Sequence, residues 1–420
     1  MTSPTDPGAS ARARGWGDAT RAIRAASRTP EVLQRPTAVP IYQTATFTTP
    51  DAESLAAVVA NPRGGYSYSR LSNPTTTALG AAYAELAGAE AGLALASGMA
   101  AIHAALASIL RAGDRVVAPL AAYGSTRIQL NGFFGRFGVI VELVDITDLD
   151  AVAAALAAAP TRLLYAESSA NPTTFVADHA ALAALAHRHG ALYFADNTFA
   201  SPYICRPLAL GADLVIESAT KYIGGHNDVT AGVVAGSQAM VDPVARVQVD
   251  TGATLAPFEA FLTIRGILTF PVRMDRHGEN ARALAGWLEG QPGVQRVLYP
   301  GLASHPQHAV VERQWRPGNG GGMLAFEVAG GRTAGQAIID TLTLPERTAS
   351  LGGVHTMVVH PPSTSQRQLS DDQLRASGIG PGMLRVSVGL EDIEDLVADL
   401  DGALAAARTV AGGATAPVGV

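Results

Sequence analysis

A lysine follows directly on a short apolar stretch and has hydroxyl side chains beside it. Residues 214–216 (LVI) predict a strand, and the chain continues as ESATKY from Glu217 to Tyr222, which places Lys221 beyond the strand end. A lysine held in place with a lowered pKa can form a Schiff base with a carbonyl compound. Ser218 and Thr220 can donate hydrogen bonds to a phosphate. The plainer interpretation of Lys221 is a surface lysine at a strand end.

An acidic residue ends the preceding predicted strand. Residues 191–195 are apolar and run directly into Asp196. A carboxylate at the tip of a buried strand is costly unless it has a partner. A protonated pyridine nitrogen would be such a partner, and the pair would strengthen a cofactor as an electron sink. The alternative is an N-cap, but residues 199–202 (FASP) are a poor helix start.

A third signal is a Ser-Gly turn between a predicted strand (91–96) and a predicted helix (99–111). Ser97 and Gly98 would place free backbone amides at the helix N-terminus, where anions bind. A turn of this kind also occurs as a simple tight connection. No Gly-Lys-Ser/Thr motif is present, so the turn is not a nucleotide P-loop.

The elements that must position these residues alternate along the chain. Strands are predicted at 91–96, 115–119, 139–144, 162–166, 191–195, 214–217 and 232–235, with helices between them, for example at 180–189. Such alternation predicts an α/β fold with a mainly parallel sheet. Ligands bind such sheets beyond the carboxyl ends of the strands.

The length of 420 residues is too great for one ordinary core. Proline-rich residues 1–68 predict an irregular arm, residues 69–256 a large domain, and residues 257–420 a smaller α+β domain. Helices at 257–276, 279–288 and 396–406 and strands at 323–328 and 383–388 are expected in the last part.

Composition excludes several classes of function. Acidic and basic residues are interspersed, with a net charge of -6 and no basic stripe, which argues against nucleic acid as the partner. The single cysteine, Cys205, excludes an intrachain disulfide and fits a cytoplasmic protein. Residues 91–110 carry no charge, but their Gly, Ser and His favour a strand, turn and helix over a membrane span. His187 and His189 would face different sides of a helix, so no metal site is expected.

Several motifs, in order along the chain, resemble those of the Cys/Met metabolism, or transsulfuration, enzymes, which use pyridoxal 5'-phosphate (PLP). This family includes methionine γ-lyase, cystathionine γ-lyase, cystathionine γ-synthase and the homoserine-ester sulfhydrylases. The resemblance runs from about residue 40 to about residue 400 and implies the aspartate-aminotransferase-like fold, fold type I. The motifs are YSRLSNPT (68–75), SGM (97–99), YG (123–124), residues 167–172, DNT (196–198), SATK (218–221) and SLGG (350–353).

The resemblance also implies roles for the cofactor's contacts. Lys221 would be the Schiff-base lysine and proton shuttle, and Asp196 would pair with the pyridine nitrogen. Asn171 would bind the phenolic oxygen, and Tyr123 would stack on the ring and act as acid/base near the leaving group. The phosphate would be bound by Ser97, Gly98, Met99, Ser218 and Thr220.

Further roles concern the substrate and a neighbouring subunit. Arg385 would grip the substrate α-carboxylate with a bidentate fork, and Ser350 would contact the same group. Tyr68 and Arg70 would reach the phosphate of a neighbouring subunit. A dimer would then be the minimum competent unit, and the family is usually tetrameric.

The chemistry implied is γ-elimination on methionine, homocysteine or cystathionine, giving 2-oxobutanoate, ammonia and a thiol. γ-Replacement, as in cystathionine γ-synthase or the sulfhydrylases, stays open because it uses the same residues. His355 stands where enzymes acting on cystathionine usually carry Glu, and Ser125 stands where methionine γ-lyases carry Cys. A PLP aminotransferase and a PLP-binding protein without turnover are the remaining alternatives.

Overall fold

The computed structural model describes residues 36–61, 64–364, 366–367, 370–376 and 378–413. Contacts divide the chain into residues 1–40 and residues 41–420, and the elements below belong to the second unit. Within the described ranges, no helix is long and apolar enough to cross a membrane. The uncharged residues 91–110 form a strand, a turn and a helix, as predicted.

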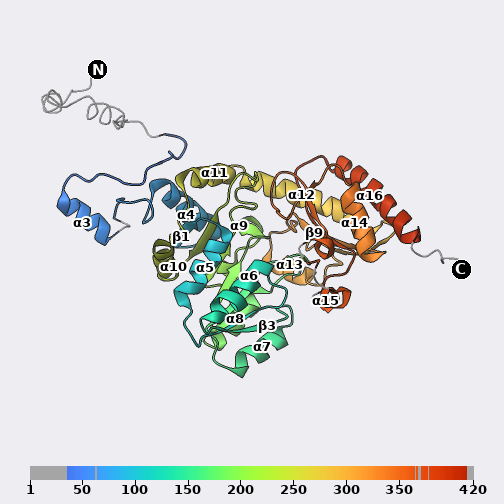
Figure 1. The fold of residues 1–420 in the computed structure, drawn as a ribbon, viewed down its shortest axis with the longest axis horizontal. Helices are drawn as coiled ribbons and strands as arrows, with labels where there is room; N and C mark the ends of the chain where they lie inside the picture. Colours follow the sequence, from blue (N-terminus) through green and yellow to red (C-terminus); the bar gives the residue numbers. More distant parts are fainter. Residues whose placement is uncertain (1–35, 62–63, 365, 368–369, 377, 414–420) are drawn as a thin grey trace, which may run out of the picture. The chain divides into compact units, whose positions relative to one another are not determined.

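Seven strands form the larger sheet, in the order β1-β7-β6-β5-β4-β2-β3 (Figure 1). Strands β2 to β6 pair in parallel, whereas β7 pairs antiparallel with both β6 and β1. This confirms the α/β class and the mainly parallel sheet. The bounds are β1 (Ala91–Leu95), β2 (Arg115–Pro119), β3 (Ile140–Val144), β4 (Leu163–Glu167), β5 (Leu192–Asp196), β6 (Leu214–Glu217) and β7 (Gly232–Gly236).

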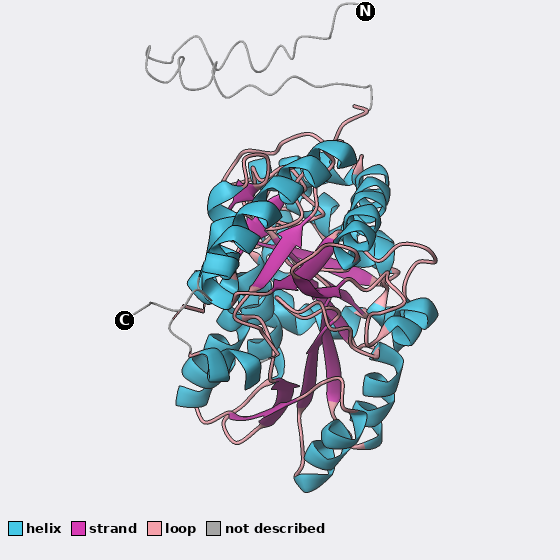
Figure 2. Cartoon of the chain, turned by 90° about the vertical axis from the view of Figure 1, so that its right-hand side faces the viewer, coloured by secondary structure: helices cyan, strands magenta, loops and turns pink. Residues whose placement is uncertain are grey.

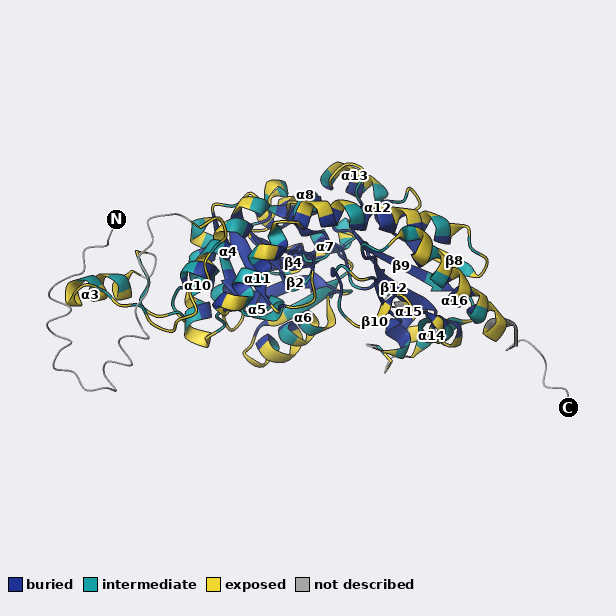
Figure 3. Cartoon of the chain, turned by 90° about the horizontal axis from the view of Figure 1, so that it is seen from above, coloured by how far each residue is buried: buried dark blue, intermediate teal, exposed yellow. Residues whose placement is uncertain are grey.

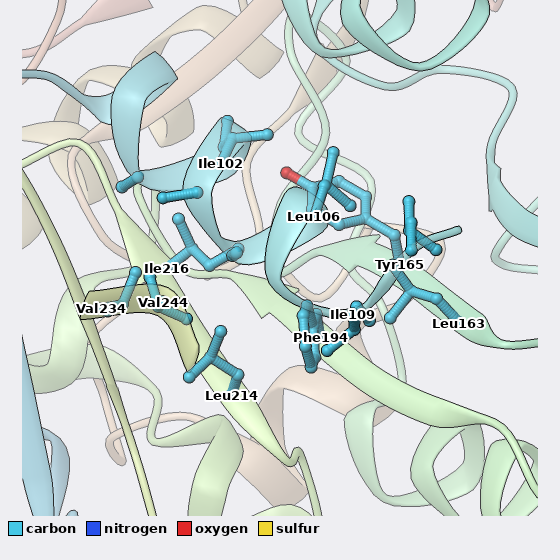
Figure 4. Close-up of a cluster of buried hydrophobic side chains, with 14 of the residues drawn as sticks. Ile102, Leu106, Ile109, Leu163, Tyr165, Phe194, Leu214, Ile216, Val234 and Val244 are labelled. Carbon is cyan, nitrogen blue, oxygen red and sulfur yellow. The ribbon is translucent and has the colours of Figure 1, made fainter. Parts of the chain in front are cut away.

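Both faces of this sheet are covered by helices. Alternate residues of each strand point to opposite faces, so each strand contributes side chains to both layers of the core. On β4, Tyr165 packs toward α5, whose Ile102 and Leu106 lie close to it in Figure 4, while Leu164 packs into a separate cluster with α7 and α8. Figure 2 shows the strands in the interior with helices around them. These helices are α4 (Pro74–Ala87), α5 (Gly98–Ile109), α6 (Gly124–Ile128), α7 (Leu149–Ala158), α8 (His179–Arg188) and α10 (Gln238–Thr251).

A second, five-stranded sheet follows in the order β10-β11-β12-β9-β8. One of its faces packs on α12, α14 and α16, and the strands β9 and β12 are buried (Figure 3). Its strands are β8 (Val294–Leu298), β9 (Met323–Val328), β10 (Glu346–Arg347), β11 (Met357–Val359) and β12 (Met383–Ser387). The helices from residue 257 onward are α11 (Pro257–Ile267), α12 (Phe270–Glu289), α13 (His308–Gln314), α14 (Gly331–Thr341), α15 (Asp371–Ala376) and α16 (Ile393–Gly413). Of these, α11 packs with α4 and the first sheet.

Two local expectations were wrong. The predicted irregular arm contains a helix, α3 (Ala52–Ala60), whose N-cap Asp51 accepts a hydrogen bond from the amide of Ser54. The predicted helix 257–276 is broken, because α11 ends at Ile267 and α12 begins at Phe270 with a proline in its first turn. Short helical segments complete the fold: the π-helix η1 (Gln129–Phe134), the α-helix α9 (Ser201–Ile204) and the 3-10 helices η2 (Pro207–Leu210) and η3 (Pro361–Ser363).

Candidate active site

Three neighbouring strands each end in a buried acidic residue. These residues are Glu167 on β4, Asp196 on β5 and Glu217 on β6, and each is at most 9% exposed. Glu167 and Asp196 are register partners across parallel strands. The carboxyl edge of the sheet therefore holds three buried carboxyl groups, whose charged form is costly without partners.

A cavity of about 240 Å³ opens at this edge. It brings together most of the residues that the sequence predicted, from both sheets. The predicted residues that line it are Ser97, Gly98, Met99, Tyr123, Asn171, Asp196, Ser218, Thr220, Lys221 and Arg385. The remaining three, Ser350, Tyr68 and Arg70, do not line it.

Lys221 is half-buried and lies near the start of the loop that follows β6. Its Nζ atom donates a hydrogen bond to Oγ of Ser350 at 2.9 Å, so Ser350 touches the site through the lysine. Burial, and then the charge of Arg385, lower the pKa of Lys221. A lowered pKa favours the neutral amine, which is the form that attacks carbonyl groups and accepts protons.

Asp196 has hydrogen-bond donors but no cation. Its Oδ1 accepts from the amide of Thr198 at 2.9 Å, and its Oδ2 accepts from the hydroxyl of Tyr165 at 3.2 Å. Burial raises the pKa of Asp196, and the bonds from Thr198 and Tyr165 oppose that shift. In the described part of the chain, no Lys, Arg or His forms an ion pair with this carboxylate. Nor does Asp196 cap the helix that follows, since α9 has Ala200 at its N-cap.

Arg385 shows the converse arrangement, a buried cation with no anionic partner among the described residues. It lies on β12 and is 4% exposed. Its Nη1 donates to Oδ1 of Asn171 at 3.0 Å and its Nη2 donates to the carbonyl of Ser350 at 2.8 Å. Its buried Nε has no hydrogen-bond partner in the part of the chain that the structure describes. Burial lowers the pKa of Arg385 to about 10. A guanidinium held this way has a donor left for a carboxylate.

The Ser-Gly turn lies beside the loop that carries the lysine. Ser97 is the N-cap of α5 and accepts a hydrogen bond from the amide of Ala100 at 3.0 Å, as a capping serine should. A Cβ atom on Gly98 would lie 2.6 Å from Cβ of Ser218, so only glycine fits there. The hydroxyl of Thr220 is bonded to the backbone of Ala231, although the residue lines the cavity.

Tyr68 and Arg70 lie apart from the cavity of their own chain. Tyr68 is 44% exposed, and Nη1 of Arg70 donates to the carbonyl of Val249 at 2.8 Å. Their predicted role toward a neighbouring subunit stays a prediction.

The cavity also contains residues for which the sequence predicted no individual role. They include Glu167, Ile102, Ser169, Phe199, Thr230, Ala349 and Leu351. Glu167 had a usable signal, because it ends the predicted strand 162–166 in the same way that Asp196 ends the next one. Ala349 and Leu351 lie in the loop between β10 and β11 of the second sheet. No local sequence pattern indicates that this loop reaches the cavity at the edge of the first sheet.

Comparison with known proteins agrees with this geometry. Residues 19–405 match the model of the family described as Cys/Met metabolism PLP-dependent enzyme. An L-methionine gamma-lyase of Pseudomonas putida is 48% identical over 369 residues, which cover 87% of this chain and 92% of that protein. A cystathionine gamma-synthase of Mycobacterium bovis is 42% identical over 389 residues, which cover 92% of this chain and 97% of that protein. The crystal structure of cystathionine gamma synthase from Xanthomonas oryzae pv. oryzae in complex with cystathionine superposes with a TM-score of 0.83 at 37% identity, covering 88% of this chain and 93% of that one. The chain therefore belongs to the family of Cys/Met metabolism PLP-dependent enzymes.

Proposed function

We propose that this PLP-dependent enzyme catalyses γ-elimination on sulfur amino acids, with L-methionine as a substrate. Methionine and water would give 2-oxobutanoate, ammonia and methanethiol. The relatives support this choice, since six L-methionine gamma-lyases from different bacteria are 42–48% identical to the chain.

One observation carries the proposal of a working catalytic site. Lys221 is the only lysine in the 420 residues, and every other residue of the Lys and Arg total is arginine. Arginine stays protonated and does not form a Schiff base. A partly buried lysine, in contrast, can lose its proton and can form a Schiff base with a carbonyl group. The one lysine lies in the same cavity as Asp196 and Arg385, neither of which forms an ion pair with a described residue.

The residues present fit PLP. Asp196 is a buried carboxylate that a pyridine nitrogen would neutralise, and Tyr123 presents a ring that could stack on the cofactor. Asn171 would contact the phenolic oxygen. The phosphate would be held at the turn and loop formed by Ser97, Gly98, Met99, Ser218 and Thr220.

When bound, PLP supplies an electron sink that lowers the cost of removing a proton from the substrate Cα. Arg385 would hold the substrate α-carboxylate, because its Nε is the donor left without a partner. The neutral amine of Lys221 would then take the proton from Cα, give it up again within the site, and so be free to take a proton from Cβ. The hydroxyl of Tyr123 would donate a proton to the departing sulfur. Each transfer needs only a positioned acid or base.

γ-Replacement is the second candidate, because a cystathionine gamma-synthase and an O-succinylhomoserine sulfhydrylase are each 42% identical to the chain. The test is to incubate the enzyme separately with L-methionine, L-cystathionine and O-acetyl-L-homoserine, with and without a thiol. 2-Oxobutanoate and ammonia from methionine without added thiol support elimination. A product formed only with a thiol would assign replacement, and amine transfer to a 2-oxo acid without ammonia would indicate an aminotransferase.

The proposed assembly is a homotetramer of two catalytic dimers. A wider cavity of about 900 Å³ shares Thr220 and Thr230 with the site, which leaves room beside it for residues of a neighbouring subunit. If Tyr68 and Arg70 act across subunits, mixing Arg70→Ala and Lys221→Ala proteins after dissociation should restore activity that neither has alone. No restored activity in mixed oligomers would contradict the shared site.

A further inference from the structure

Glu167 is a carboxylate in the cavity to which the proposed reaction gives no part. It is the last residue of β4, is 7% exposed and lies beside Asp196 on the neighbouring strand. In the described part of the chain, no cationic side chain pairs with it. A buried carboxylate in this position is costly to keep, so its contacts should account for its presence.

Its closest polar contact is with the backbone of Tyr123. The amide N–H of Tyr123 donates a hydrogen bond to Oε1 of Glu167 at 2.6 Å, across 44 residues of sequence. Tyr123 precedes the short helix α6 and makes no capping bond with its own side chain. Its amide would otherwise have no acceptor from the helix, since the first amides of a helix are unsatisfied. The contact therefore anchors the loop between β2 and α6 to the tip of β4.

The electrostatic surroundings of Glu167 are consistent with its role as a hydrogen-bond acceptor for backbone amides. Burial, and then the charge of Asp196, raise the pKa of Glu167 to about 8, while the amides of Tyr123 and Asn171 act in the opposite direction and lower it. A carboxyl group can present an acceptor oxygen in two directions, whereas glutamine has one oxygen and an NH2 group that donates and cannot accept from an amide. This difference favours Glu over Gln at position 167.

We propose that Glu167 is a positioning residue, whose carboxylate fixes the backbone of Tyr123 and thereby sets the Tyr123 ring against the cofactor. The proposal rests on the cofactor contact of Tyr123 under the proposed function. Glu167 itself exchanges no proton with the substrate. Its effect on the site is transmitted by the short loop that ends at Tyr123.

The test compares PLP binding in four proteins: wild type, Glu167→Gln, Tyr123→Ala and the double variant. Each is stripped of PLP and titrated with it, and visible circular dichroism reports how the bound ring is held. In Glu167→Gln the dissociation constant for PLP should rise on the order of tenfold, the equivalent of about one hydrogen bond, and the visible dichroism should weaken. In the Tyr123→Ala background the same change should have little further effect, since coupled residues are not additive.

Two controls keep the outcomes distinct. Asp399→Asn removes a carboxylate that also accepts backbone amides, those of Thr343 and Leu344, and should leave PLP binding unchanged. Glu167→Asp keeps the charge but shortens the side chain, and it replaces Glu167→Gln if that variant does not fold. An unchanged dissociation constant and dichroism in Glu167→Gln, or an equal loss with and without the Tyr123 ring, would overturn the proposal. If the wild type binds no PLP, the proposed function fails instead.

Discussion

Arg385 and Asn171, which are 214 residues apart in the sequence, are joined by a hydrogen bond of 3.0 Å from Nη1 of the arginine to Oδ1 of the asparagine. Arg385 comes from the second sheet, and Asn171 from the loop after β4 of the first. The carbonyl of Ser350 accepts from Nη2 on another side. The guanidinium is thus oriented before a substrate arrives, which reduces the ordering cost of binding.

Replacing Arg385 by lysine should weaken substrate binding selectively. Lysine keeps the charge but loses the planar fork, so it cannot bind Asn171, Ser350 and a carboxylate together. The KM for methionine should rise roughly 10- to 100-fold, while PLP stays bound. Steady-state kinetics on holoenzyme measure this, with Arg276→Lys, at an exposed ion pair with Asp392, as the control. An unchanged KM in Arg385→Lys would contradict the assignment.

A methyl group at Gly98 should damage the phosphate end of the site. Its Cβ would lie 2.6 Å from Cβ of Ser218, so the turn or the lysine loop must move. We expect Gly98→Ala to lose about 1–3 kcal/mol of stability and to bind PLP more weakly. Thermal unfolding and PLP titration measure both effects. Gly286→Ala on α12, where no atom lies within 4 Å of the added carbon, is the matched control. Equal behaviour of the two variants would refute the close fit at Gly98.

Acid should destabilise the protein through buried neutral histidines. In His277, Nδ1 is bonded to the carbonyl of Val388 at 2.7 Å, and the buried Nε2 has no partner. Burial lowers the pKa of His277 from 6.5 to about 4. A lowered pKa means that the unfolded chain takes up the proton first, so stability is present above pH 6.5 and is lost as pH falls toward 4. The loss from this one group is at most roughly 3 kcal/mol.

His277→Gln should therefore make the unfolding free energy less dependent on pH between 6.5 and 4 than it is in the wild type. Denaturant unfolding at several pH values measures the slope. His179 and His305 have their pKa values lowered to about 4 in the same way, so part of the dependence should persist. A slope in His277→Gln equal to that of the wild type would contradict this assignment.

The sequence predicted the parts of the site that depend on local order along the chain. One apolar run ends in Asp196 and the next leads to Lys221. These runs were enough to predict that the two residues lie close together, because parallel strands place their carboxyl ends at one edge of the sheet. The antiparallel β7 was not predicted, although residues 218–231 between β6 and β7 contain no helix, which an antiparallel neighbour allows. The contacts of Arg385 with Asn171 and of Lys221 with Ser350 depend on how the second sheet packs, and local periodicity carries no information about that packing.

The most direct test of the central claim is to locate the PLP label after borohydride reduction of the holoenzyme. Peptide mass analysis is decisive here, because Lys221 is the only lysine and the N-terminal amine is the only other primary amine in the chain. The label should appear on the peptide containing Lys221 and should be absent from Lys221→Arg, which keeps the charge but cannot react. No label, or a label on the N-terminal amine alone, would contradict a Schiff base at Lys221 and the catalytic site built around it.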